Sequence, residues 1–246
     1  MLNTGARGGV ACFHVDSEAG LIPAGPYMQL PIAESTPPTG PPNTASDIVF
    51  NPSQTALFVT VKGDGTNPGY LYAFAVKNGA LLAPPVVSRP ADLLVDFGLT
   101  FIDDRHAVVA DPSYGASFIE IAYPSLEVTV TNKVTVTGQA AICWITYSDR
   151  FNAVYLLDAG HPNITALDPV TGNIKYVIPS TVDTTGNFDS TVSGTYLYSL
   201  RGAAAISVFD LTGSVGNHKV PKLVQDFNLS SLGSRQGWQG LAVYPN

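Results

Sequence analysis

Charged side chains are scarce in this sequence of 246 residues: they make up 13% of it, and the twelve Lys and Arg residues are scattered along the chain. A surface that binds nucleic acid needs clustered positive charge, so we predict no nucleic-acid partner. Long apolar runs are missing too, since none approaches the roughly 18–20 residues that cross a bilayer, and we predict no membrane span. The first residues, MLNTGARGG (1–9), lack the apolar core of a signal peptide, which taken alone predicts a cytoplasmic protein.

Cysteine is nearly absent as well. Cys12 and Cys143 are the two cysteines, and they lie far apart in the sequence. Two such residues make neither a disulfide framework nor a zinc site, and no two of the four histidines have the spacing of metal ligands. The chain has no G-x-S-x-G nucleophile turn and no glycine loop in the strand–turn–helix context that binds phosphate. We therefore predict two buried free thiols, no metal and no cofactor.

Glycine (23 residues) and proline (19 residues) are plentiful instead, which favours short strands joined by tight turns. The chain also repeats itself. Five strand-like segments share a bulky apolar residue at their fourth position, and they start 61, 47, 46 and 42 residues apart: VACFHV (10–15), LYAFAV (71–76), FIEIAY (118–123), ITALDP (164–169) and ISVFDL (206–211). The long first interval contains the inserted Pro-rich segment STPPTGPPNT (35–44).

A second pattern alternates with the first and predicts hairpins around polar turns. In three copies an aromatic residue is followed eight residues later by an apolar one: IVFNPSQTALFV (48–59), LTFIDDRHAVV (99–109) and ITYSDRFNAVYL (145–156). A fourth copy, STVSGTYLYSL (190–200), is degenerate, and LAVYPN (241–246) repeats only the first half. About 45 residues and four antiparallel strands per repeat are typical of a β-propeller blade. We predict one all-β domain over residues 1–246, a propeller with four whole blades and a fifth split between the two ends of the chain.

Several segments carry a family resemblance: NTGARGGVACFHVDSEAGL (3–21), TPPTGPPNTASDIVFNPSQTALFVTVKGD (36–64), ADPSYGA (110–116) and DAGHPNITALDPVTGNI (158–174). They resemble the fungal lactonase-like, 3-carboxymuconate cyclase-like family. The resemblance implies a seven-bladed propeller, of which this chain would be a fragment without the N-terminal blades; a true five-bladed form is the alternative. It also implies a secreted or cell-wall glycoprotein, and two sequons, at Asn163 and Asn228, would then accept glycans.

Candidate site residues follow from the propeller geometry, in which the loop after the second strand and the loop leading into the first strand share one face. Five residues at these positions are predicted to bind ligand: Lys62, Asp96, Gln139, Asp189 and Arg201. Of this set, the two basic residues would pair with a carboxylate substrate. Candidate catalytic residues are Arg201, Asp158 and Asp111. An Asp that follows a strand also commonly forms a turn with nearby backbone N–H groups, and Lys62 also fits a solvated loop residue.

Two functions remain at this stage. The first is a non-catalytic secreted glycoprotein whose channel-mouth loops bind a small molecule or a cell-wall or host component. The alternative is a cycloisomerase or lactonase acting on a small carboxylate or lactone by general acid–base chemistry. The resemblance implies an enzyme that uses His, Arg and Glu around the channel mouth, and no residue-by-residue match to that set is found here. We therefore favour binding.

Overall fold

The computed structural model describes residues 1–179, 182, 184–214, 219–235 and 237–244. Nearly all regular structure is antiparallel sheet, with two 3-10 turns, η1 (Thr212–Ser214) and η2 (Ser230–Leu232). The chain forms two compact units: unit 1 comprises residues 1–107 and 119–131, and unit 2 comprises residues 108–118 and 132–246. Because the division runs through one of the sheets, the single domain over residues 1–246 stays a prediction.

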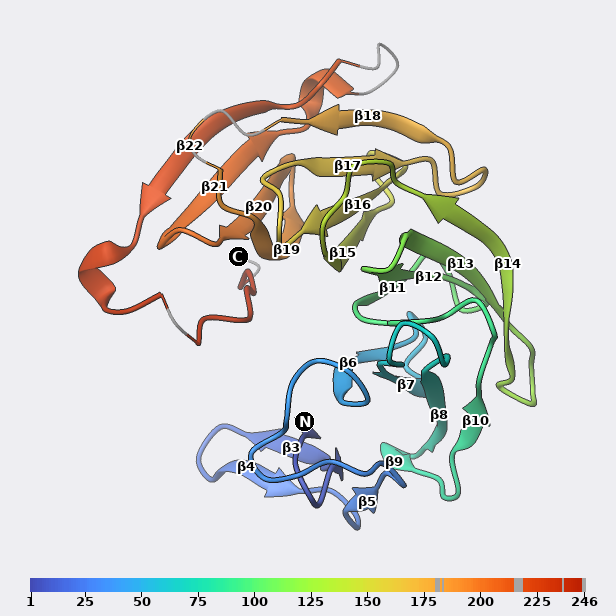
Figure 1. The fold of residues 1–246 in the computed structure, drawn as a ribbon. Helices are drawn as coiled ribbons and strands as arrows, with labels where there is room; N and C mark the ends of the chain where they lie inside the picture. Colours follow the sequence, from blue (N-terminus) through green and yellow to red (C-terminus); the bar gives the residue numbers. More distant parts are fainter. Residues whose placement is uncertain (180–181, 183, 215–218, 236, 245–246) are drawn as a thin grey trace. The chain divides into compact units, whose positions relative to one another are not determined.

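Four sheets of the predicted kind follow one another along the chain, each with its strands in sequence order (Figure 1). The first sheet comprises β6 (Ala45–Phe50), β7 (Ala56–Val61), β8 (Tyr70–Lys77) and β10 (Val86–Ser88), with β9 (Ala80–Leu81) paired to β8. The second comprises β11 (Leu99–Phe101), β12 (His106–Asp111), β13 (Gly115–Ile121) and β14 (Val128–Thr135). The third comprises β15 (Ile142–Ser148), β16 (Ala153–Asp158), β17 (Ile164–Leu167) and β18 (Ile174–Ile178). The fourth comprises β19 (Asn187–Ser193), β20 (Tyr196–Arg201), β21 (Ala205–Asp210) and β22 (Lys222–Asn228).

Both sequence patterns correspond to strands of these sheets. The repeated hairpins are the first two strands of each sheet, and in the first sheet Val49 pairs with Phe58. Four of the five bulky fourth positions of the other repeat lie in the third strands and are buried: Phe74, Ile121, Leu167 and Phe209. The middle strands are deeply buried, since every residue of β7, β16 and β17 is buried. The outermost strand β22 is almost entirely exposed.

Turn residues with unusual backbone freedom close these hairpins. Asn152, in the β15–β16 turn, has a φ of 46°, a left-handed conformation that asparagine tolerates better than most residues. Gly194, in the β19–β20 turn, has a φ of 60°. In the β6–β7 turn the Asn51 side chain accepts the Ala56 N–H at 2.8 Å. These local preferences fix each hairpin, and the alternating apolar residues fix its buried face.

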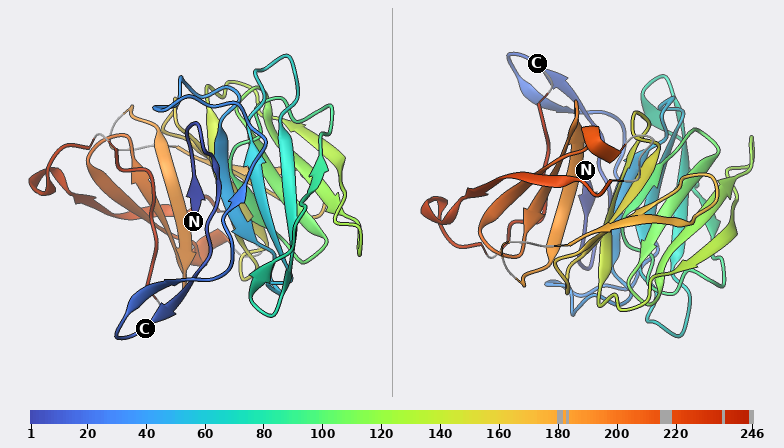
Figure 2. Two further views of the ribbon diagram at one scale, coloured as in Figure 1. Left: turned by 90° about the horizontal axis from the view of Figure 1, so that it is seen from below. Right: turned by 90° about the horizontal axis from the view of Figure 1, so that it is seen from above.

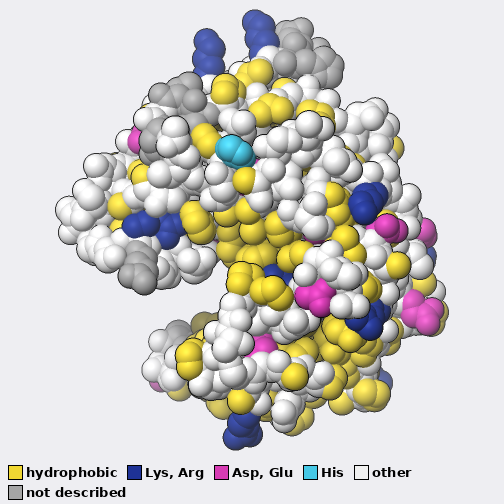
Figure 3. All heavy atoms as spheres, in the orientation of Figure 1, with side chains coloured by type: hydrophobic (Ala, Val, Ile, Leu, Met, Phe, Trp, Pro, Cys, Tyr) yellow, Lys and Arg dark blue, Asp and Glu magenta, His cyan; other side chains and the backbone are white. Residues whose placement is uncertain are grey.

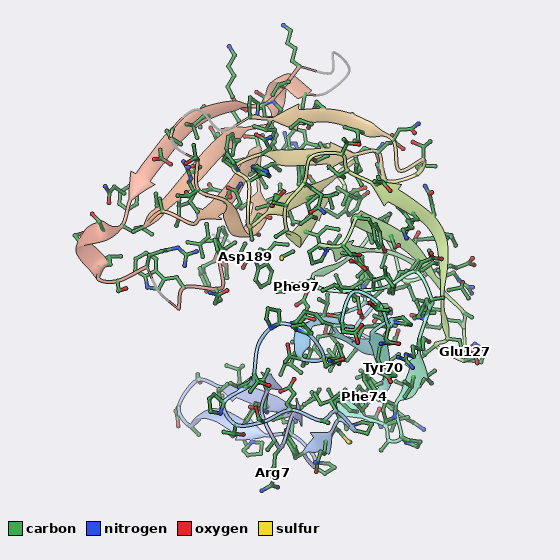
Figure 4. The ribbon with its side chains drawn as sticks, viewed as in Figure 1. Arg7, Tyr70, Phe74, Phe97, Glu127 and Asp189 are labelled. Atoms are coloured by element: carbon green, nitrogen blue, oxygen red, sulfur yellow. The ribbon has the colours of Figure 1, made fainter. Side chains whose placement is uncertain are left out.

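Each unit has its own hydrophobic core. In unit 1 the first sheet contributes Val59, Tyr72 and Phe74, which pack with Val10 and Leu30 from the N-terminal segment (Figure 4). In unit 2 the third and fourth sheets share a core that contains Tyr155, Leu157, Ile164, Leu197 and Phe209. Adjacent sheets in each unit therefore pack face to face through buried side chains.

The N-terminal strands differ from the prediction. The segment VACFHV (10–15) is not one strand, because β2 (Gly9–Val10) pairs with β1 (Leu2–Asn3) and β5 (Met28–Gln29), whereas β3 (Phe13–Asp16) pairs with β4 (Gly20–Pro23). The chain changes partners at this point: the Ala11 N–H donates to Met1 O and the Cys12 carbonyl accepts from Ala24. The β3–β4 hairpin stands away from the other strands of unit 1 (Figure 2).

The predicted fifth blade, shared by the two ends of the chain, also has other strands than expected. Its N-terminal part is a three-stranded sheet made of β1, β2 and β5 alone. At the other end, residues 237–244 contain no strand, and Pro245 and Asn246 lie outside the described residues. β5 pairs with β2 on the side away from β1, so it does not take the place next to residues 1–3 that the prediction gave to the C-terminal strand. Among the described residues, no strand pairs with the other edge of β1.

Candidate functional site

The first hairpins of three sheets begin with the same local geometry. Their pairing shifts register by one residue after the first pair, which is a β-bulge that re-aims the next side chain. The re-aimed residues are Asp47, Trp144 and Asp189. The residue after the second strand donates its N–H to the residue before the first strand: Lys62 to Thr44, Ala159 to Ala141 and Gly202 to Gly186. Most of the predicted site residues lie at this end of a hairpin, either at the end of the second strand or near the start of the first.

Two of the re-aimed residues are carboxylates that tie backbone segments together. Asp47 accepts the N–H of Ile48 through one oxygen and that of Leu99, at 2.9 Å, through the other. Asp189 does the same with Ser190 and Leu241, the latter at 2.6 Å (Figure 4). Burial raises the pKa of Asp47, and the two N–H groups oppose that rise. Asp189, a predicted ligand residue, thus holds the segment around Leu241 in place.

Lys62 lies in the wall of a cavity of about 370 Å³ in unit 1. Lys62 is 5% exposed, and its ammonium group donates to Ala45 O at 3.3 Å and lies 4.4 Å from the centre of the Phe97 ring (Figure 4). The cavity is lined on its other sides by Asn43, Tyr70 and the apolar segment 31–33. The side chain is therefore held in a fixed position and is not a solvated loop residue.

Asp96 is fully buried beside the same strand end. Its carboxylate lies against Gly69: a Cβ placed on that glycine would come within 1.9 Å of the Asp96 carboxylate and 2.2 Å of Val61 O. The Asp96 carbonyl also accepts the Ser46 hydroxyl at 3.0 Å. Lys62 and Asp96, two predicted ligand residues, are thus brought to one end of β7, and glycine at position 69 makes room for the carboxylate.

The loop after Lys62 contains an acid with a strongly lowered pKa. Asp64 accepts the side-chain amide of Asn67 and the backbone N–H groups of Asn67 and Thr66, and these bonds lower its pKa to about 2. Because a lowered pKa favours the ionised form, Asp64 stays charged well below the usual range for Asp.

Replacing Asn67 by Ala is expected to raise the pKa of Asp64 toward its ordinary value, because the largest stabilising bond is then lost. In a carbon-detected NMR titration between pH 5 and 3, the Asp64 carboxyl shift should stay nearly constant in the parent chain and move in Asn67→Ala. The exposed Asp16, whose lowered pKa depends on other bonds, serves as the internal reference. Equal titration of Asp64 in both proteins contradicts the assignment.

In unit 2 both candidate acids accept hydrogen bonds from nearby protein groups. The buried Asp158 accepts four backbone N–H groups at 2.8–3.0 Å, from Ala140, Ala141, Gly160 and His161. Asp111 is fully buried and accepts both the N–H and the hydroxyl of Ser113. These are the bonds of turn-forming aspartates, the structural alternative that the sequence left open.

Gln139 and Arg201 are likewise engaged with neighbouring groups. The Gln139 amide donates to Pro112 O at 2.8 Å and accepts the Ile142 N–H at 3.0 Å. The Arg201 guanidinium is 2% exposed and lies 3.4 Å from the Asp226 carboxylate, with which it forms an ion pair. A buried cation paired in this way stabilises the fourth sheet, because an unpaired one would be costly.

The structure brings some predicted residues together within each unit. Lys62 and Asp96 gather in unit 1, and Gln139 and Asp158 both line a second cavity, of about 210 Å³, in unit 2. Asn163 and Asn228, the predicted glycan acceptors, are exposed, and glycosylation stays a prediction. Over the described part of the chain, no group of three or more His, Cys, Asp or Glu side chains could hold a metal ion, and no helix is long and apolar enough to span a membrane.

Sequence reasoning missed the aromatic and amide residues around Lys62. Phe97 directly follows the candidate Asp96, and Tyr70 directly precedes the predicted strand 71–76, so both lay next to residues that the sequence had singled out. Asn43 lies at the end of the Pro-rich insertion. A search for aromatic residues beside the candidate charges would have found the first two, because cations pack on ring faces.

No family model matches the chain, and no curated protein matches it. Solved structures do. A provisionally named 6-phosphogluconolactonase from Bacteroides uniformis has a TM-score of 0.67 at 15% identity, over 91% of this chain and 65% of its own length. A second such protein, from Bacteroides fragilis, has a TM-score of 0.54 at 12% identity, over 92% and 80%. Sqt1 from Chaetomium thermophilum has a TM-score of 0.64 at 11% identity, over 92% and 57%.

These likenesses decide the fold. The chain is an all-β protein with a β-propeller fold, as the repeat predicts. It spans between 57% and 80% of the length of these three structures. The narrower resemblance to fungal secreted proteins, and the extracellular location that it implies, stay predictions.

Proposed function

We propose that this lactonase-like propeller binds a small carboxylate ligand in the Lys62 cavity and does not catalyse a reaction on it. One observation carries the proposal: Lys62, whose ammonium group is held by Ala45 O and the Phe97 ring, lines a cavity of about 370 Å³. That volume is within the range of about 300–1,000 Å³ typical of small-molecule sites. A cation in such a wall favours a carboxylate by charge-assisted hydrogen bonding.

The chemistry of the other candidates supports binding over catalysis. A general acid or base must reach the proton it transfers, and an acid fully engaged in backbone hydrogen bonds is poorly suited to that role. Asp158 accepts N–H groups from its own turn and from Ala140 and Ala141, Asp111 accepts an N–H group in its own turn, and Arg201 is paired with Asp226. The cycloisomerase or lactonase alternative therefore has no acid–base pair among the residues that the sequence nominated.

Binding is tested by calorimetric titration with muconate, a small dicarboxylate, and with glucono-δ-lactone, which is uncharged. We expect muconate to bind and Lys62→Met to weaken it by roughly tenfold to hundredfold, because one charge-assisted hydrogen bond is lost. Lys62→Arg should retain part of the affinity. Lys77→Met, which removes an exposed lysine from β8 of the same sheet, should leave binding unchanged.

The same samples separate binding from catalysis. Muconate absorbs in the ultraviolet, so lactonisation would show as a falling absorbance. A stable absorbance during saturable binding supports the proposal, whereas turnover that is lost in Lys62→Met supports the enzyme instead. Equal affinity of the parent chain and Lys62→Met, both folded by circular dichroism, contradicts the role of Lys62.

A further inference from the structure

The second cavity, in unit 2, has a lining of a different chemical kind. It lies between the β14–β15 connection, at residues 135–139, and the loop after β16, with strands β17 and β18 on its other side. Its volume of about 210 Å³ equals that of about seven water molecules at roughly 30 Å³ each. This is below the size of a typical drug-sized pocket and suits one small molecule.

The walls of this cavity are held rigidly from within. Asp158 joins the two loops, because its carboxylate accepts N–H groups from Ala140 and Ala141 on one side and from Gly160 and His161 on the other. Gln139 adds a link to Pro112. A ligand would therefore meet a preformed surface, which lowers the entropic cost of binding.

The groups that face the cavity are mainly neutral donors and acceptors. They include the hydroxyls of Thr135, Thr137 and Thr165 and the amide of Asn163. Within the described residues, none of these four side chains has a hydrogen bond to the protein. Hydroxyl and amide groups both donate and accept, which matches the hydroxyl groups of a polyol or a sugar.

An apolar strip completes the lining. Ile174 and Val177, on β18, are 47% and 40% exposed where they border the cavity. An amphipathic ligand with hydroxyl groups on one side and C–H groups on the other would cover these side chains and gain from removing them from water.

Charge separates this cavity from the one at Lys62. Among the residues that line it in the described part of the chain, there is no Lys or Arg and one histidine, His161, and the single carboxylate, Asp158, accepts backbone N–H groups. We propose that this cavity is a binding site for a small neutral polyhydroxylated ligand of about the size of one sugar ring. The site is independent of the Lys62 cavity and of the carboxylate proposed to bind there.

The test is a titration followed by 1H–15N NMR, with D-glucose, myo-inositol and D-glucuronate as probes. The protein is made in bacterial cells, so that Asn163 carries no glycan. We expect glucose or myo-inositol to shift the amides of residues 135–139 and 161–165 saturably, with a millimolar dissociation constant. Glucuronate should bind more weakly, because no Lys or Arg among the described residues lines this cavity to pair with its charge.

Variants make the assignment specific. Thr135→Val with Thr137→Val removes two hydroxyls at nearly constant shape and should weaken binding by about tenfold or more. Thr129→Val is the matched control, since it lies on β14 six residues before Thr135 and does not line the cavity. The absence of saturable shifts with either neutral probe overturns the proposal, as does equal affinity of the double variant. Tighter binding of glucuronate than of the neutral probes also overturns the proposal, because the site would then prefer an anionic ligand.

Discussion

Asp158→Ala is expected to cost about 4 kcal/mol of the free energy of unfolding, because four part-buried hydrogen bonds from backbone N–H groups to a carboxylate are lost, each worth about 1 kcal/mol. Water entering the space would offset part of the sum. At about 2–4 °C per kcal/mol for a chain of this size, the melting temperature should fall by roughly 8–16 °C. Thermal and urea denaturation measure both quantities.

Two further variants show that the loss belongs to this geometry. Asp168→Ala removes a turn aspartate that also accepts two backbone N–H groups, but those bonds are exposed, so its effect should be several times smaller. Asp158→Asn keeps the shape and one acceptor oxygen, and should fall between the parent and Asp158→Ala. A loss below about 1 kcal/mol for Asp158→Ala would show that the turn does not depend on its carboxylate.

Gly186→Ala is expected to destabilise the chain by about 3 kcal/mol or more, or to prevent soluble expression. A Cβ at this position would lie 2.1 Å from Ala159 O, 2.3 Å from the Ala159 carbonyl carbon and 2.7 Å from Asp158 O. All three neighbours are backbone atoms, which cannot move aside as a flexible side chain can. The Gly202 N–H bond to Gly186 O, at 2.7 Å, would be displaced with them.

Gly240→Ala is the matched control, because a Cβ there meets nothing within 4 Å and the backbone is not left-handed. It should leave stability within about 0.5 kcal/mol of the parent. Hydrogen exchange gives a second measure if Gly186→Ala folds, since the Gly202 amide should then exchange faster than in the control. A Gly186→Ala protein as stable as Gly240→Ala would contradict the close approach.

The repeat was readable in the sequence because it depends on periodic burial. The four hairpins and the buried residues Phe74, Ile121 and Leu167 follow from alternation of apolar and polar residues within strands, which a single chain displays directly. The break between β2 and β3 was not readable, because the change of partner at Ala11 and Cys12 depends on which backbone groups meet in space. An uninterrupted alternating run gives no sign of such a change.

The roles of the candidate charges were the least predictable part. An aspartate after a strand has the same sequence signature whether it closes a turn or faces a ligand, and only the positions of the surrounding N–H groups decide between the two. Arg201 illustrates the point, since its partner Asp226 lies 25 residues away on β22. For Lys62 the hairpin pattern predicts a position just after a strand, and β7 does end at Val61, whereas its ring partner Phe97 lies in another connection.

The carboxylates of Asp47 and Asp189 have a consequence for how this fold tolerates change. Each accepts a hydrogen bond from a backbone N–H of a following segment, at Leu99 and Leu241, and the side chain of that residue takes no part in the bond. This hydrogen bond does not depend on the side chain at either position, so packing alone selects that side chain, as it does for the buried Leu99. Proline, which has no backbone N–H, is the one residue that this interaction forbids.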